Sequence, residues 1–155
     1  MNYGRLALAT VAAFVVDAIY GFLVYGMALT NQFSRYPGVY RPPQDTSHMP
    51  MLFGGILIGA ATAAYIYAKG YEGGSGVAEG IRFGGALGIF VGGYSTLINW
   101  AVLNIGRSLA ISMAVAGFVE WLLIGLVIGL IYKPAVTFNR AADHASSAAR
   151  RGTGV

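Results

Sequence analysis

Four long apolar blocks, separated by short polar connections, dominate the sequence. They cover residues 6–29, 50–68, 77–103 and 109–132, and the third is diluted by glycine. About 20 residues at about 1.5 Å each cross the hydrocarbon core of a bilayer. The blocks are apolar all round, so a water-soluble bundle of them would have no polar surface. The pattern predicts an all-α fold, a four-helix transmembrane bundle.

Composition supports this prediction. The chain of 155 residues is 56% hydrophobic and 10% charged, whereas soluble domains carry about a quarter charged residues. The first block is longer than the apolar region of about 7–15 residues in a signal peptide, so we expect it to remain as the first span. We predict a transmembrane domain over residues 1–135 and a mobile basic tail over 136–155.

Basic residues predict the orientation. Four spans place both termini and the connection 69–76 on one side of the membrane. Seven of the ten basic residues fall on that side: Arg5, Lys69, Arg82, Lys133, Arg140, Arg150 and Arg151. The positive-inside rule then predicts that both termini are cytoplasmic. The net charge of +4 favours an anionic lipid surface over nucleic acid as partner, because no basic stripe with interleaved aromatics occurs outside the blocks.

Two acidic residues interrupt the apolar blocks. Asp17 lies near the middle of the first block and Glu120 near the middle of the fourth. These spans run antiparallel, so both acids should lie at a similar depth. Steps of four residues from each acid reach Ala13, Gly21 and Ala116, which places the acids on small-residue ridges that face other helices. We expect the two carboxyls to face one another.

Energy favours a neutral or shared-proton state for this pair. A charge at the bilayer centre costs about 2.5–3.5 kcal/mol on insertion scales. A shared proton, or hydrogen bonds to other polar groups within the spans, would satisfy the carboxyls; the candidates are Tyr20, Thr62, Asn99 and Ser112. Arg82 enters from the cytoplasmic end, and we expect it to extend towards the surface or pair with Glu79. Three roles remain for the acids: interhelical hydrogen bonding, a proton or ion relay, or a counter-charge for a substrate amine.

Glycine repeats every fourth residue along the third block. Positions 76, 80, 84, 88 and 92 fall nearly above one another on a helix and form a groove without side chains. In lipid, helices associate through close backbone approach, so this groove predicts a docking face for a neighbouring helix. A pore lining is the alternative. The residues expected to mediate helix packing are Gly80, Gly84, Gly88, Gly92, Ala13, Gly21 and Ala116.

The connections carry little chemistry. Residues 30–50 contain prolines and aromatics that predict an interfacial strap, with a lid or docking surface as the alternative. His48, Met49 and Met51 are weak candidate ligands for Cu(I), and helix-start punctuation explains them equally well. The glycine-rich connection 70–76 lacks the Gly-Lys-Ser/Thr ending of a phosphate loop. No catalytic set or nucleotide fingerprint occurs, so we expect no enzyme activity and no cofactor.

The two halves of the chain show a weak internal similarity. Residues 57–67, "LIGAATAAYIY", match 123–132, "LIGLVIGLIY", and residues 22–31, "FLVYGMALTN", match 90–99, "FVGGYSTLIN". Duplicated hairpins of this kind occur in some transporters. Apolar sequence of low diversity also produces such matches by chance, so both interpretations stay open.

The segments "MNYGRLALA", "YAKGYEGGSGVAEGIRFG", "NIGRSLA" and "GLVIGLIYKP" resemble a group of small bacterial four-span membrane proteins of unknown function. The resemblance covers most of residues 1–135 and implies four spans and a location in the bacterial inner membrane, but no activity. The leading hypothesis is a non-enzymatic packing or accessory protein that self-associates or joins a larger membrane complex. The alternative is a small proton-linked transporter or channel that uses Asp17 and Glu120.

Overall fold

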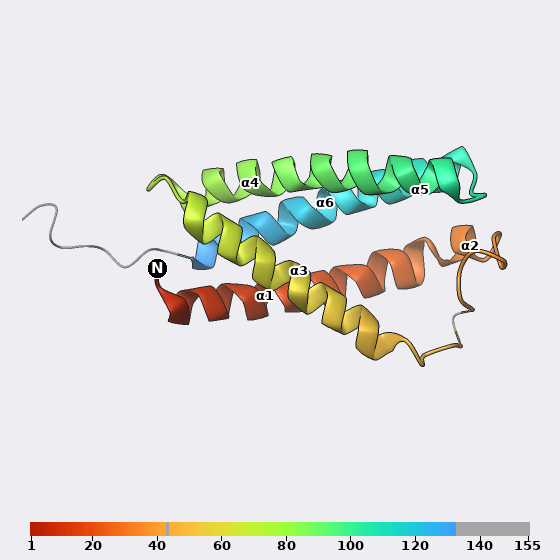
Figure 1. Cartoon of the computed structure of the whole chain (residues 1–155), viewed down its shortest axis with the longest axis horizontal. Coiled ribbons are helices and arrows are strands. Elements are labelled where there is room, and N and C mark those ends of the chain that lie inside the picture. The colour runs from red at the N-terminus through yellow and green to blue at the C-terminus, as the bar shows by residue number, and fades with distance from the viewer. Residues whose placement is uncertain (43, 133–155) are drawn as a thin grey trace, which may run out of the picture.

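A computed structural model describes residues 1–42 and 44–132, and these residues form a helical bundle (Figure 1). In chain order the elements are α1 (Tyr3–Gly21), the π-helical segment η1 (Phe22–Ala28), α2 (Thr30–Phe33), α3 (Met49–Gly70), α4 (Gly76–Phe90), the π-helical segment η2 (Val91–Thr96), α5 (Leu97–Val102) and α6 (Arg107–Ile131). The described part of the chain contains no strand. The predicted all-α fold is confirmed.

Four helices are long and apolar enough to cross a membrane. They are Tyr3–Ala28, Met49–Gly70, Gly76–Val102 and Arg107–Ile131, so α1 continues into η1, and α4 continues through η2 into α5. Each begins and ends within a few residues of a predicted block. The N-terminus and the end of α6 lie at the same end of the bundle (Figure 1). The cytoplasmic orientation stays a prediction, and the predicted tail over 136–155 lies outside the described residues.

The closest helix pair in the bundle is α4 with α6, which run side by side (Figure 1). A Cβ atom added at Gly80 would lie 2.5 Å from the carbonyl oxygen of Gly125, and one added at Gly76 would overlap the carbonyl oxygen of Gly129. A Cβ atom at Gly84 would lie 3.0 Å from the Cα atom of Leu122. The glycine row of α4 is therefore covered by α6 of the same chain, with the two backbones in direct contact.

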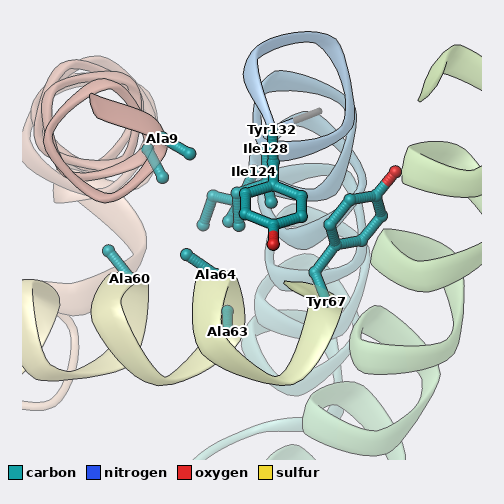
Figure 2. Close-up of a cluster of buried hydrophobic side chains, with 9 residues drawn as sticks. Ala9, Ala60, Ala63, Ala64, Tyr67, Ile124, Ile128 and Tyr132 are labelled. Atoms are coloured by element: carbon teal, nitrogen blue, oxygen red, sulfur yellow. The ribbon is translucent and has the colours of Figure 1, made fainter. Parts of the chain in front are cut away.

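Alanines let α3 approach α1 in the other half of the bundle. Ala9 and Ala13 of α1 are fully buried, and Ala60, Ala63 and Ala64 of α3 are at most 3% exposed. Together with Ile124, Ile128, Tyr67 and Tyr132 they form the larger buried cluster (Figure 2). Without a hydrophobic force between helices in lipid, small side chains favour association by permitting many close dispersion contacts. The beginning of α3 diverges from the bundle (Figure 1).

The connection between α2 and α3 packs across the start of α6. Tyr36 and Tyr40 lie against a small buried cluster of Ile105, Leu109 and Ala110. The backbone N–H of Gly106 donates to the Tyr36 hydroxyl at 2.9 Å. The connection between α2 and α3 therefore packs as a strap across the start of the fourth span.

A turn built on Asp45 ends the strap. Asp45 Oδ1 accepts hydrogen bonds from the Ser47 hydroxyl at 2.5 Å and the Ser47 backbone N–H at 3.2 Å. Arg41 Nη1 lies 3.2 Å from Asp45 Oδ2. These donors stabilise the carboxylate and lower the pKa of Asp45 to about 2, with the Ser47 hydroxyl as the largest cause.

The α4–α6 contact predicts different effects of one substitution at two adjacent glycines. Gly84→Ala should lower the free energy of unfolding by about 1–3 kcal/mol, because its methyl group overpacks against α6. Gly85→Ala is the matched control: a Cβ atom there meets nothing within 4 Å, and the better helix propensity of alanine should leave stability unchanged or raise it by up to about 1 kcal/mol. Thermal unfolding in detergent micelles measures both, and equal effects at the two positions would contradict the backbone contact.

The Asp45 turn predicts a defined pH dependence. Because folding lowers the pKa of Asp45, its contribution to the turn is present above the ordinary value of 3.8 and is lost as pH falls towards about 2. A carboxyl-detected NMR titration should place the midpoint near 2 in the intact protein and closer to 3.8 in Ser47→Ala. Arg41→Ala should move the midpoint upward by less. An unshifted Ser47→Ala midpoint would show that the hydroxyl does not hold the carboxylate.

Candidate functional site

Asp17 of α1 and Glu120 of α6 meet inside the bundle, near the middle of their spans. Their side chains are close neighbours, and both residues are partly buried. Ionised carboxylates only accept hydrogen bonds. A hydrogen bond between two neighbouring carboxyls can therefore form only when one of them carries a proton.

Tyr25 completes the pair from the same span as Asp17. Its hydroxyl donates to Glu120 Oε2 at 3.1 Å. A regular α-helix turns about 100° per residue, which would place Tyr25 about 80° around the axis from Asp17. Tyr25 instead lies in η1, whose wider i→i+5 turns advance less per residue. The π-helical segment thus turns Tyr25 towards the face that carries Asp17.

Tyr20 supports the site without contacting either acid by a hydrogen bond. Its hydroxyl donates to the backbone carbonyl oxygen of Ala116 at 2.9 Å. The rings of Tyr20 and Tyr25 pack edge to face, with centroids 6.4 Å apart. A Cβ atom at Gly117 would lie 3.8 Å from the Tyr25 hydroxyl, an ordinary van der Waals contact, so the Tyr25 hydroxyl lies over this turn of α6. The two tyrosines fix α1 and η1 against the turn of α6 that precedes Glu120.

Three of the polar residues named from the sequence lie elsewhere. The Ser112 hydroxyl donates to Gln32 Oε1 at 3.3 Å, and Asn99 Nδ2 donates to Ser95 Oγ at 3.4 Å. Thr62 is exposed on α3. Ser112 precedes Glu120 by eight residues, which is about 12 Å along a helix axis, so it serves the strap end of the bundle and not the acids.

Sequence reasoning missed Tyr25, although a signal was present. The same steps of four residues that connect Asp17 with Ala13 and Gly21 reach Tyr25 at the next step. Gln32, the partner of Ser112, had no comparable signal, because it follows η1 in the short helix α2.

The small residues named for helix packing have different neighbours. Gly80, Gly84 and Gly88 lie against α6, and a Cβ atom at Gly92 would lie 3.7 Å from the carbonyl oxygen of Ala114. Ala13 is buried in the alanine cluster. Ala116 is 7% exposed and accepts the Tyr20 hydrogen bond. At Gly21 the nearest atom to an added Cβ belongs to Tyr25 of its own span, 4.0 Å away.

Of the two alternatives predicted for Arg82, extension towards the surface agrees with its 69% exposed side chain, and pairing with Glu79 is not found. Arg82 Nη2 lies 3.4 Å from Glu72 Oε2, while Glu79 Oε1 accepts a hydrogen bond from the backbone N–H of Gly74 at 2.5 Å. The glycine-rich connection folds back over the start of α4, so the backbone N–H of Gly74, and not the Arg82 guanidinium, is the hydrogen-bond partner of Glu79. Across residues 1–42 and 44–132, no salt bridge involves Asp17 or Glu120.

The weak metal candidates are not gathered into a site. His48 Nδ1 lies 2.6 Å from Ser47 Oγ and 3.7 Å from Asp45 Oδ2, within the Asp45 turn. Met49 and Met51 are 41% and 79% exposed at the start of α3. In the described ranges, no group of three or more His, Cys, Asp and Glu side chains is placed to hold a metal ion.

No protein-family model, curated protein or solved structure matches the chain. The resemblance to small bacterial four-span proteins therefore rests on the quoted segments, and the structure supports its coarser part, four helices suited to cross a membrane.

Proposed function

We propose that this protein is a small proton-linked membrane transporter or channel in which Asp17 and Glu120 hold one proton between them. The observation that carries the proposal is the close approach of these two carboxyls at matched depth in antiparallel spans. Ionisable groups inside a membrane are costly and mark proton and ion pathways. In this proposal the protein has no enzymatic activity and lies in the bacterial inner membrane.

The electrostatics of the pair favour binding of a single proton. Two negative charges close together repel strongly where water is scarce, which favours protonation of one of the two acids. Tyr25 supplies a hydroxyl donor to Glu120 at 3.1 Å, which stabilises the carboxylate that lacks the proton. Interhelical hydrogen bonding alone would not need two acids at one depth.

The structure also weakens the argument for association through glycine. The row on α4 suggested a docking face for a partner helix, but α6 of the same chain occupies it. The glycine row, which favoured an accessory role, is thus used for packing within one chain. The bundle does not need the Asp17–Glu120 pair for its packing, so the pair is the better candidate for a function.

Proton flux into proteoliposomes tests the proposal. With a pH-sensitive dye inside the vesicles and a potassium diffusion potential as driving force, the intact protein should acidify the lumen well above empty vesicles. Asp17→Asn and Glu120→Gln should each reduce this rate at least tenfold, because neither variant can exchange the shared proton. Tyr25→Phe should reduce the rate less, since both carboxyls remain.

Asp45→Asn is the matched control, because it makes the same chemical change in the strap, outside the spans. Its flux should equal that of the intact protein. Flux no higher than in empty vesicles, or equal flux in Asp17→Asn, Glu120→Gln and the control, would overturn the proposal.

A second candidate, a self-associating accessory subunit, is favoured by one apolar groove. The groove has a volume of about 320 Å³ and lies between η2–α5 and the first half of α6; its lining includes Gly92, Thr96, Leu97, Trp100, Ala110 and Ala114. Small residues permit close helix approach in lipid. The occupant in this proposal is a helix of a second copy of the chain.

Oligomeric state in mild detergent tests this second candidate. Light scattering after size exclusion should show a dimer for the intact chain and a monomer for Ala114→Leu, which fills the groove. Ala78→Leu, at an exposed position of α4, should remain dimeric. A monomeric intact chain with no partner that co-purifies would remove this candidate.

A further inference from the structure

A second polar site lies where α3 ends and α4 begins, well away from the carboxyl pair. A hollow of about 360 Å³ opens between these helices, and its lining includes Tyr67, Glu72, Glu79, Arg82 and Phe83. Tyr67 belongs to the last turn of α3 and Glu79 to the first turn of α4. The hollow therefore sits at the end of two spans, where a membrane surface would lie.

Tyr67 presents a hydroxyl that the described part of the chain does not satisfy. The residue is 4% exposed, and its hydroxyl is buried without a hydrogen-bond partner among the described residues. Figure 2 shows its side chain reaching from α3 towards α4. The Glu79 carboxylate is its charged neighbour. A buried hydroxyl without a partner is unfavourable, so this group points to something that occupies the space beside it.

Glu79 places a carboxylate at the same point. It is 7% exposed, and the hydrogen bond to its Oε1 comes from the backbone N–H of Gly74. A Cβ atom at Gly74 would lie 2.8 Å from that oxygen, so glycine lets the connection close onto the carboxylate. No side-chain cation pairs with Glu79 in the described ranges. A buried carboxylate of this kind calls for a positively charged partner.

Aromatic rings pack around the ring of Tyr67. The Tyr67 ring packs against Phe83 with centroids 5.4 Å apart, and against Tyr71 and Tyr132 with centroids 6.1 Å apart. Aromatic faces attract cations through their quadrupole. Glu79, Tyr67 and Phe83 all line the hollow, and a carboxylate, a hydroxyl acceptor and an aromatic ring together form the chemistry that binds an ammonium ion. Calcium fits poorly, because it takes six to eight oxygen ligands.

The rim of the hollow adds a group of opposite charge. Arg82 and Glu72 form an ion pair there at 3.4 Å, with side chains 69% and 75% exposed. Exposed pairs contribute little to stability, so these side chains can rearrange when a ligand enters. Arg82 can then meet an anionic group of the same ligand, about one helical turn from Glu79.

We propose that the α3–α4 hollow binds a primary ammonium group that is linked to a phosphate, as in phosphoethanolamine. The ammonium N–H groups donate to the Glu79 carboxylate and the Tyr67 hydroxyl, the ring of Phe83 flanks the charge, and Arg82 contacts the phosphate. Two sources share this chemistry: the headgroup of phosphatidylethanolamine and a free phosphoethanolamine in solution. The site is independent of the proposed proton pair, and its failure would leave that proposal unchanged.

Binding measurements on the full chain in a neutral maltoside detergent test the proposal. Native mass spectrometry or calorimetry should show short-chain phosphatidylethanolamine binding at least tenfold more tightly than short-chain phosphatidylcholine, whose trimethylammonium group has no N–H to donate. Free phosphoethanolamine forms a separate arm. Binding of the lipid alone identifies a headgroup site, and binding of both probes identifies a site for the headgroup chemistry itself.

Variants connect this binding to the hollow. Tyr67→Phe should weaken binding at least fivefold while leaving the melting temperature unchanged or higher, because it removes a hydroxyl without a partner. Glu79→Gln should weaken binding further. Tyr65→Phe is the matched control, since Tyr65 is exposed on the same helix, and it should bind as the intact protein does. Equal affinity for the two lipids, no binding in either arm, or unchanged affinity in Tyr67→Phe would each overturn the site.

Discussion

The direct contact between the backbones of α4 and α6 organises this bundle. Glycines on both helices, such as Gly80 and Gly125, remove the side chains that would separate the axes. Helices that cross a lipid phase gain nothing from hydrophobic transfer on meeting each other, so their association depends on dispersion contacts and hydrogen bonds over a close interface. The α4–α6 pair is the part of the structure where this requirement is met most fully, and α1 and α3 pack against it through alanine.

This arrangement positions both candidate sites. Holding α6 against α4 exposes the opposite face of α6 to α1, and Glu120 on that face meets Asp17. At the end of the bundle the same contact brings the start of α4 close to α3, which places Glu79 beside Tyr67. One site lies at the middle of the spans and the other at their end, and each combines carboxylate and phenol groups with little basic compensation in the described residues.

The two π-helical segments show how irregular geometry serves the bundle. η1 turns Tyr25 towards Asp17, and π-helical turns in other proteins often occur at functional positions. η2 falls in the corresponding part of the third span. η1 lies within residues 22–31 and η2 within residues 90–99, the two segments that match in sequence. This correspondence agrees with a duplicated hairpin, which stays a hypothesis.

Much of the fold followed from the sequence by itself. The four spans, the inward direction of Asp17 and Glu120 and their common depth follow from block length, antiparallel order and the fourfold spacing of small residues, all of which are local properties of a helix. Only the tertiary structure decided which helix covers the glycine row, which tyrosine reaches Glu120, and which acid pairs with Arg82. Those outcomes depend on a π-helical change of register, on a connection that folds back onto α4, and on the choice among several small-residue faces. Small-residue faces cannot be told apart in a single sequence, because each permits close helix approach and none indicates which helix will pack against it.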